Sequence, residues 1–182
     1  MKFILFNLLA ISMLSIPLRI NKNSEDDKIL WSSTKRLKWD DFKGMANDTL
    51  DTHVAQTQGS IEIVRTEIYK NIPKITLHCY FIKSLSWTKV DDIETLNHEQ
   101  LHFDIYELFT RKIRKAFNEL NRKNISDINE YQKVYNLYIE KCNAFNELYD
   151  HEVYFNEKKQ LMWNLKIEQE LKKLKDFEYI DI

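Results

Sequence analysis

The chain has 182 residues, a formal net charge of −1 and 43% hydrophobic residues, which are enough for a core. This length suits one compact domain with an export segment and excludes two independent folds. The near-neutral charge gives no strong field for attracting nucleic acid, so we expect no nucleic-acid partner. Only two glycines and two prolines occur, so obligatory turns are few and long helices should dominate.

The N-terminus has the pattern of an export segment. Lys2 supplies a positive charge, and the run from Phe3 to Leu18 is almost wholly apolar. At about 16 residues the run is too short to span a bilayer but fits a signal-peptide core. A buried N-terminal helix is the alternative, but the run is not amphipathic and a polar stretch follows it directly.

This pattern sets the expected domain boundaries and location. We predict a signal peptide or export segment at residues 1–22, a linker at 23–34 and a single domain at 35–182. The domain is expected outside the cytoplasm, in the periplasm or the extracellular space. No stable membrane span is expected after processing.

Strands are predicted between residues 31 and 90. Apolar and polar residues alternate over 60–64 and over 74–82, and 71–74 between them is a plausible hairpin connection. The second strand places four apolar residues on one face: Ile75, Leu77, Cys79 and Phe81. The preceding segment 31–44 is rich in aromatic residues and is expected to form an ordered edge or loop.

From Asp91 onward the apolar spacing becomes helical. Asp91 or Asp92 can cap a first helix that ends at 121–124. Ser126 or Asp127 opens a second helix to about Tyr149, and a third covers roughly 156–177. The first helix has a core-facing stripe: Ile105, Leu108, Phe109, Ile113, Phe117 and Leu120. The predicted fold is α+β, a small N-terminal antiparallel sheet followed by a helical half.

Two cysteines are too few for a disulfide framework. Cys79 falls in a predicted strand and Cys142 in a predicted helix, both in apolar surroundings. They either pair in the exported domain or remain buried thiols.

The strongest chemical signal is His98-Glu-Gln-Leu-His102 on the first predicted helix. Histidines four residues apart lie one helical turn apart on one face, so both imidazoles can reach one ion. Glu99 lies on the adjoining flank, where it can take a proton from water without being a ligand. The alternative is that these are two surface histidines on a charged helix. Asp104 is charged where such motifs usually carry an apolar residue.

A catalytic zinc ion needs a third protein ligand. The candidates cluster at the end of the second predicted helix and are Asp150, His151 and Glu152. Tyr149 or Tyr154 could stabilise an oxyanion. His53 and His78 are isolated and are expected to be ordinary surface or polar-layer residues.

Several blocks along the chain match the pattern of a known family. They are 37–44 (Leu-Lys-Trp-Asp-Asp-Phe-Lys-Gly), 55–61, 84–87, 96–105, 149–152 and the pair Gln160 and Trp163. In this order they resemble a bacterial family of unknown function that is described as secreted zinc-dependent proteases. The resemblance covers about 35–165, and the charged Asp104 belongs to its metal-motif block.

The resemblance implies a zincin-like domain with an HExxH active-site helix, in which zinc is bound by His98 and His102 and Glu99 is the base. Many members continue the last block into threonine-x-histidine-glycine, whereas this chain reads Val-Tyr-Phe-Asn at 153–156. The matching tyrosine–aspartate pair favours Asp150 as the third ligand.

Two functions are therefore expected from different classes. The first is an extracytoplasmic zinc metallopeptidase that hydrolyses a protein or peptide substrate. The alternative is a non-catalytic exported scaffold or binding domain that retains a zinc site. Glu99 separates them, because a binding domain has no need of a carboxylate between the two histidines.

Overall fold

The computed structural model describes residues 26–46, 53–154 and 156–180. The strands are β1 (Lys28–Leu30), β2 (Ala55–Gln56), β3 (Gly59–Tyr69), β4 (Ile72–Ile82) and β5 (Trp87–Thr88). The α-helices are α1 (Ile93–Arg122), α2 (Ile128–Val153) and α3 (Glu157–Lys173). Three short 3-10 helices are η1 (Trp39–Asp41), η2 (Lys83–Leu85) and η3 (Lys175–Phe177). The predicted export segment at residues 1–22 lies outside the described residues.

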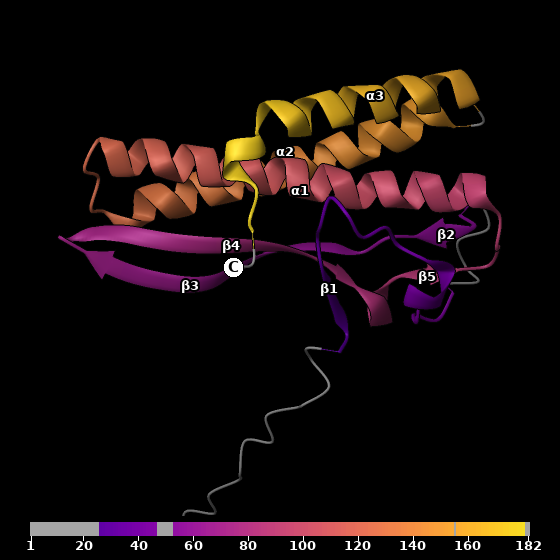
Figure 1. Ribbon diagram of the computed structural model, residues 1–182, viewed down its shortest axis with the longest axis horizontal. Helices are drawn as coiled ribbons and strands as arrows, with labels where there is room; N and C mark the ends of the chain where they lie inside the picture. The colour runs from indigo at the N-terminus through magenta and orange to yellow at the C-terminus, as the bar shows by residue number, and fades with distance from the viewer. Residues whose placement is uncertain (1–25, 47–52, 155, 181–182) are drawn as a thin grey trace, which may run out of the picture.

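The α+β order is as predicted, a small antiparallel sheet followed by three helices (Figure 1). The main sheet has the order β1-β4-β3, and β2 pairs with β5 in a separate two-stranded sheet. All three α-helices lie on one face of the main sheet (Figure 1). Helix α1 contacts β3 and β4 on one side and α2 and α3 on the other, so it is the central element of the fold.

The hairpin β3–β4 is longer than predicted. Tyr69 pairs with Ile72, so its loop is only Lys70 and Asn71, which have φ angles of 49° and 65°. Two consecutive positive φ angles are typical of the type I′ turn, whose twist matches that of the strands. The predicted connection at 71–74 was wrong, because a Lys-Asn turn lacks the glycine that marks most such turns.

The predicted linker 23–34 was wrong from Lys28 onward. Lys28–Leu30 forms β1 and pairs with Tyr80–Ile82 of β4. A strand of three residues is too short for the alternation of side chains to be recognised in the sequence. The folded domain therefore begins before residue 35. The segment that follows β1 is ordered as expected, with Phe42 between the rings of Trp39 and Phe81.

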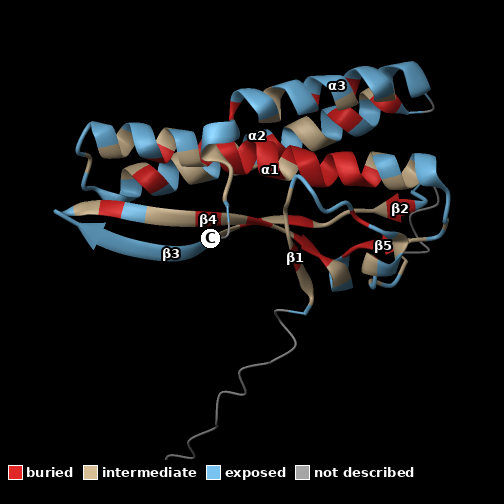
Figure 2. Ribbon diagram, in the orientation of Figure 1, coloured by how far each residue is buried: buried red, intermediate tan, exposed pale blue. Residues whose placement is uncertain are grey.

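The core lies along α1, where buried residues concentrate (Figure 2). The predicted stripe is confirmed, with Ile105, Leu108, Phe109, Ile113 and Phe117 all buried and Leu120 partly buried. Cys79 and Cys142 are buried free thiols and not a pair. None of the helices among the described residues is long and apolar enough to cross a membrane.

Each α-helix begins at a side-chain cap. Asp92, Asp127 and Asn156 accept hydrogen bonds from the backbone N–H groups of the first turns of α1, α2 and α3. The cap at Asp92 confirms one of the two predicted starts of the first helix. Helix α2 continues to Val153, beyond the predicted end near Tyr149, so Asp150 lies in its last turn.

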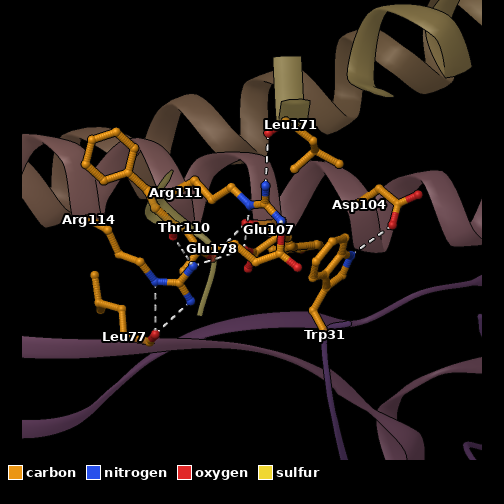
Figure 3. Close-up of polar contacts among 11 residues, drawn as sticks. Trp31, Leu77, Asp104, Glu107, Thr110, Arg111, Arg114, Leu171 and Glu178 are labelled. Atoms are coloured by element: carbon orange, nitrogen blue, oxygen red, sulfur yellow. Dashed lines mark hydrogen bonds and ion pairs between the residues drawn. The ribbon is translucent and has the colours of Figure 1, made fainter. Parts of the chain in front are cut away.

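A group of buried charges joins α1 to the C-terminal segment (Figure 3). The Arg111 guanidinium forms ion pairs with Glu107 and Glu178 and donates to the carbonyl of Leu171. Arg114 also pairs with Glu107 and donates to the carbonyl of Leu77 in β4. Buried charges require such partners, because an unpaired one loses its hydration without compensation.

Asp104 binds the N-terminal segment to α1. Its carboxylate accepts hydrogen bonds from the indole N–H of Trp31 at 2.9 Å and from Gln100 at 2.9 Å, and pairs with Arg36 at 3.3 Å. Burial raises the pKa of Asp104, and the bonds from Trp31 and Arg36 oppose this rise. The charged residue at this motif position is therefore explained by its contacts with the N-terminal segment, and it is compatible with the histidine motif.

Candidate metal centre

The two motif histidines and Asp150 converge on one point. His98 and His102 lie one turn apart on α1, with their Nε2 atoms 3.1 Å apart. From the last turn of α2, Oδ1 of Asp150 lies 3.1 Å from Nε2 of His98 and 2.8 Å from Nε2 of His102. These three side chains could hold a metal ion. Two imidazoles and a carboxylate are a donor set that suits transition metals.

The other ring nitrogen of each histidine faces a side-chain amide. Nδ1 of His98 lies 3.2 Å from Oε1 of Gln160 on α3, and Nδ1 of His102 lies 2.8 Å from Oδ1 of Asn146 on α2. Sequence reasoning missed Asn146 as a site residue and noted Gln160 only in the resemblance. The available signal for Asn146 was its position one helical turn before Asp150, on the same face of α2.

The ring of Tyr149 packs against both histidines. Its ring stacks on His98 at 4.7 Å between ring centroids and meets His102 edge-on at 4.9 Å. Its hydroxyl is hydrogen-bonded to Oε1 of Gln160 at 2.8 Å, and burial raises the pKa of this phenol. Because Tyr149 is fully buried and its hydroxyl donates to Gln160, this hydroxyl is not available to a substrate, so the structure does not support Tyr149 as the oxyanion donor. Tyr154 is exposed.

Glu99 occupies an unusual environment for a carboxylate. The residue is only 4% exposed, and its Oε2 atom has no hydrogen-bond partner among the described residues. Glu99 directly follows His98 on α1. Burial acts to lower the pKa of His102, but the hydrogen bond to Asp150 and the negative charges of Glu99 and Asp150 raise it, and the net direction is upward. A buried carboxylate oxygen without a partner costs folding free energy, so no contact of Oε2 explains Glu99 as a stabilising residue.

The structure separates the three candidates for the third donor. Only Asp150 reaches the histidines. His151 is exposed on α2, and Glu152 accepts a hydrogen bond from the indole N–H of Trp163 at 2.9 Å. His78 contacts Tyr80 and Tyr179 and belongs to the sheet, which agrees with the expectation of a polar-layer residue.

A cavity of about 490 Å³ opens on another face of α1, and none of the three converging residues lines it. Its walls include Trp31, Gln100, Asp104 and Asn164. Asn164 accepts a hydrogen bond from Nε2 of Gln160, so one wall residue is a single hydrogen bond from the amide that holds His98. Because Gln100 and Asp104 line the cavity and His98 and His102 do not, the cavity and the donor group lie on different sides of α1.

Comparison of the chain with protein-family models, curated proteins and solved structures gives no match.

The charges of the donor group predict a pH dependence of the metal-free protein. Burial disfavours the charged forms of both residues, but the hydrogen bonds between Asp150 and the histidines dominate, so the pKa of His102 is raised and that of Asp150 is lowered. Protonated His102 stabilises the fold below its ordinary pKa of 6.5, and this stability is lost as pH rises through its folded value. The Asp150 contribution is present above its ordinary pKa of 3.8 and is lost as pH falls.

The free energy of unfolding of the metal-free protein should therefore fall as pH rises above about 6.5. Urea unfolding in the presence of a chelator measures it. Asp150→Asn should flatten this dependence, whereas the control His151→Gln, at an exposed position on the same helix, should leave it unchanged. If the free energy of unfolding changed equally with pH in wild type and Asp150→Asn, the interaction of Asp150 with the two histidines would be contradicted.

Proposed function

We propose that the protein is an extracytoplasmic zinc-dependent metallopeptidase that hydrolyses peptide bonds in a protein or peptide substrate. The observation that carries the proposal is the buried Oε2 of Glu99, which has no hydrogen-bond partner among the described residues and belongs to the residue that follows His98, one of the three converging donors. A scaffold protein gains nothing from such a carboxylate, which costs stability. A hydrolase needs one, because water must lose a proton to attack a carbonyl group.

The donor group fits zinc. Tetrahedral zinc with ligands at about 2.0–2.1 Å separates its donor atoms by roughly 3.3 Å. The donor atoms here are 2.8 to 3.1 Å apart, so small side-chain shifts suffice. Three protein donors, and not four, are typical of catalytic zinc sites, which keep one position open.

The chain's own residues then have distinct roles. Zinc bound by His98, His102 and Asp150 would supply the Lewis acidity that lowers the pKa of a water molecule and polarises the scissile carbonyl. Oε2 of Glu99 accepts the proton of the attacking water and returns it to the nitrogen of the leaving amine. Burial keeps Oε2 free of competing solvent, since the residue is nearly inaccessible.

Two features of the sequence support the same function. The blocks between residues 37 and 163 resemble the family described as secreted zinc-dependent proteases. The apolar run from Phe3 to Leu18 supports a location in the periplasm or the extracellular space.

The test is hydrolysis of an unfolded protein carrying a quenched fluorophore, and of a mixture of random peptides, by zinc-loaded protein. Cleavage that a chelator abolishes and zinc restores is the expected result. Tight zinc binding without cleavage of either probe would overturn the peptidase proposal and favour the exported scaffold.

A further inference from the structure

Each histidine that binds a metal ion must present an unprotonated ring nitrogen to it. A neutral imidazole carries one N–H, and the hydrogen bond made by the other nitrogen decides which one it is. In this protein the nitrogens that face the common point are both Nε2, and the nitrogens that face away are both Nδ1.

Both Nδ1 atoms face atoms that can only accept. Oδ1 of Asn146 and Oε1 of Gln160 are amide oxygens, so each Nδ1 donates its N–H to them. When both rings are neutral, as metal binding requires, this arrangement leaves the lone pair of each Nε2 directed at the common point. The two amides come from different helices, α2 and α3, and each serves one histidine of α1.

The orientation of each amide is fixed by its other hydrogen bonds. Nδ2 of Asn146 donates to the carbonyl of Cys142 at 3.0 Å, and Nε2 of Gln160 donates to Oδ1 of Asn164 at 2.8 Å. The Tyr149 hydroxyl donates to Oε1 of Gln160 at 2.8 Å. Rotating the Asn146 amide by half a turn would place its oxygen against the carbonyl of Cys142, where two acceptors repel each other.

We propose that Asn146 and Gln160 are the positioning residues of the metal centre, which hold both histidines in the Nδ1-protonated form and aim both Nε2 atoms at the ion. The proposal deepens the proposed function and rests on its metal site. Because both supporting groups are neutral amides, Asp150 is the one anionic group among these five side chains, and a divalent ion there keeps a net positive charge. Carboxylates in the same positions would cancel that charge.

The first test measures zinc affinity by competition with a chelating indicator. Asn146→Leu and Gln160→Leu should each weaken zinc binding by about 10- to 100-fold. Asn146→Asp and Gln160→Glu retain an acceptor oxygen and should bind zinc within a few-fold of wild type. If Asn146 had a purely structural role, Asn146→Asp should weaken zinc binding as much as Asn146→Leu does, because both variants lose the hydrogen bond to the carbonyl of Cys142.

Matched controls lie on the same helices. Asn143→Leu on α2 and Gln169→Leu on α3 change exposed side chains and should leave zinc affinity unchanged. Zinc affinity within about twofold of wild type in both Asn146→Leu and Gln160→Leu would overturn the proposal.

A second readout uses the wild-type zinc protein and does not depend on the folding of any variant. Nuclear magnetic resonance should detect two histidine Nδ1–H protons protected from exchange, one from His98 and one from His102. Absence of both protected protons in zinc-loaded protein would overturn the proposal. Neither readout requires catalysis, so zinc binding that depends on both amides without any hydrolysis would refute the peptidase proposal alone.

Discussion

Replacing Glu99 by glutamine should lower the rate of peptide hydrolysis by about 10²–10⁴-fold while leaving zinc binding intact. The amide has nearly the shape of the carboxylate but cannot accept a proton from water. Because Oε2 of Glu99 is buried and has no partner in the described part of the chain, a neutral amide should be less costly there than a carboxylate. The free energy of unfolding should therefore be unchanged or raised in Glu99→Gln.

Initial hydrolysis rates, zinc affinity and urea unfolding of the same preparations measure the three quantities. Glu94→Gln is the matched control, since Glu94 is an exposed carboxylate in the first turn of α1. It should leave hydrolysis unchanged. A Glu99→Gln protein that binds zinc and cleaves at the wild-type rate would show that Glu99 is not the base.

The largest loss of stability is expected from Arg111→Met. Arg111 is 2% exposed, and its removal leaves the buried carboxylate of Glu107 with Arg114 alone and takes away the partner of Glu178. Breaking a buried ion pair at one partner typically costs about 3–5 kcal/mol. The methionine side chain keeps much of the volume of the arginine stem, so the loss reports mainly on the charges.

Urea unfolding in the presence of a chelator measures this loss without a contribution from metal binding. Arg122→Met on the same helix is the control; that side chain is 75% exposed, and its change should stay within about 0.5 kcal/mol. The double variant Arg111→Met/Glu107→Met should lose less stability than Arg111→Met, because no carboxylate is then left buried at position 107. A loss below about 1 kcal/mol in Arg111→Met would contradict the account of this network.

The sequence predicts the helical half of the fold well. Its apolar stripe repeats over several turns, and its helix starts carry Asp or Asn caps that the structure retains. The strand β1 and the turn at Lys70-Asn71 were not predictable, since three residues show no period and a two-residue turn without glycine carries little signal.

The candidate site likewise has residues that local sequence predicts and residues that it does not. The spacing of His98 and His102 places both on one helix face, so this pair follows from local geometry. Asp150, Asn146 and Gln160 reach the pair only through the packing of α2 and α3 against α1. Tertiary packing of this kind leaves no mark in local periodicity. For this reason the residues alone left Asp150 as one of three alternatives, only the family resemblance favoured it and included Gln160, and Asn146 was missed.

The metal content of the purified domain tests the central claim most directly. After equilibration with zinc and removal of the excess, elemental analysis should give about one zinc per chain in wild type and none in His98→Ala or His102→Ala. Asp150→Ala should bind zinc weakly, whereas His151→Ala, at the neighbouring exposed position, should retain it. Absence of zinc from the wild type, or its retention in both histidine variants, would contradict the assignment of this group as a metal centre.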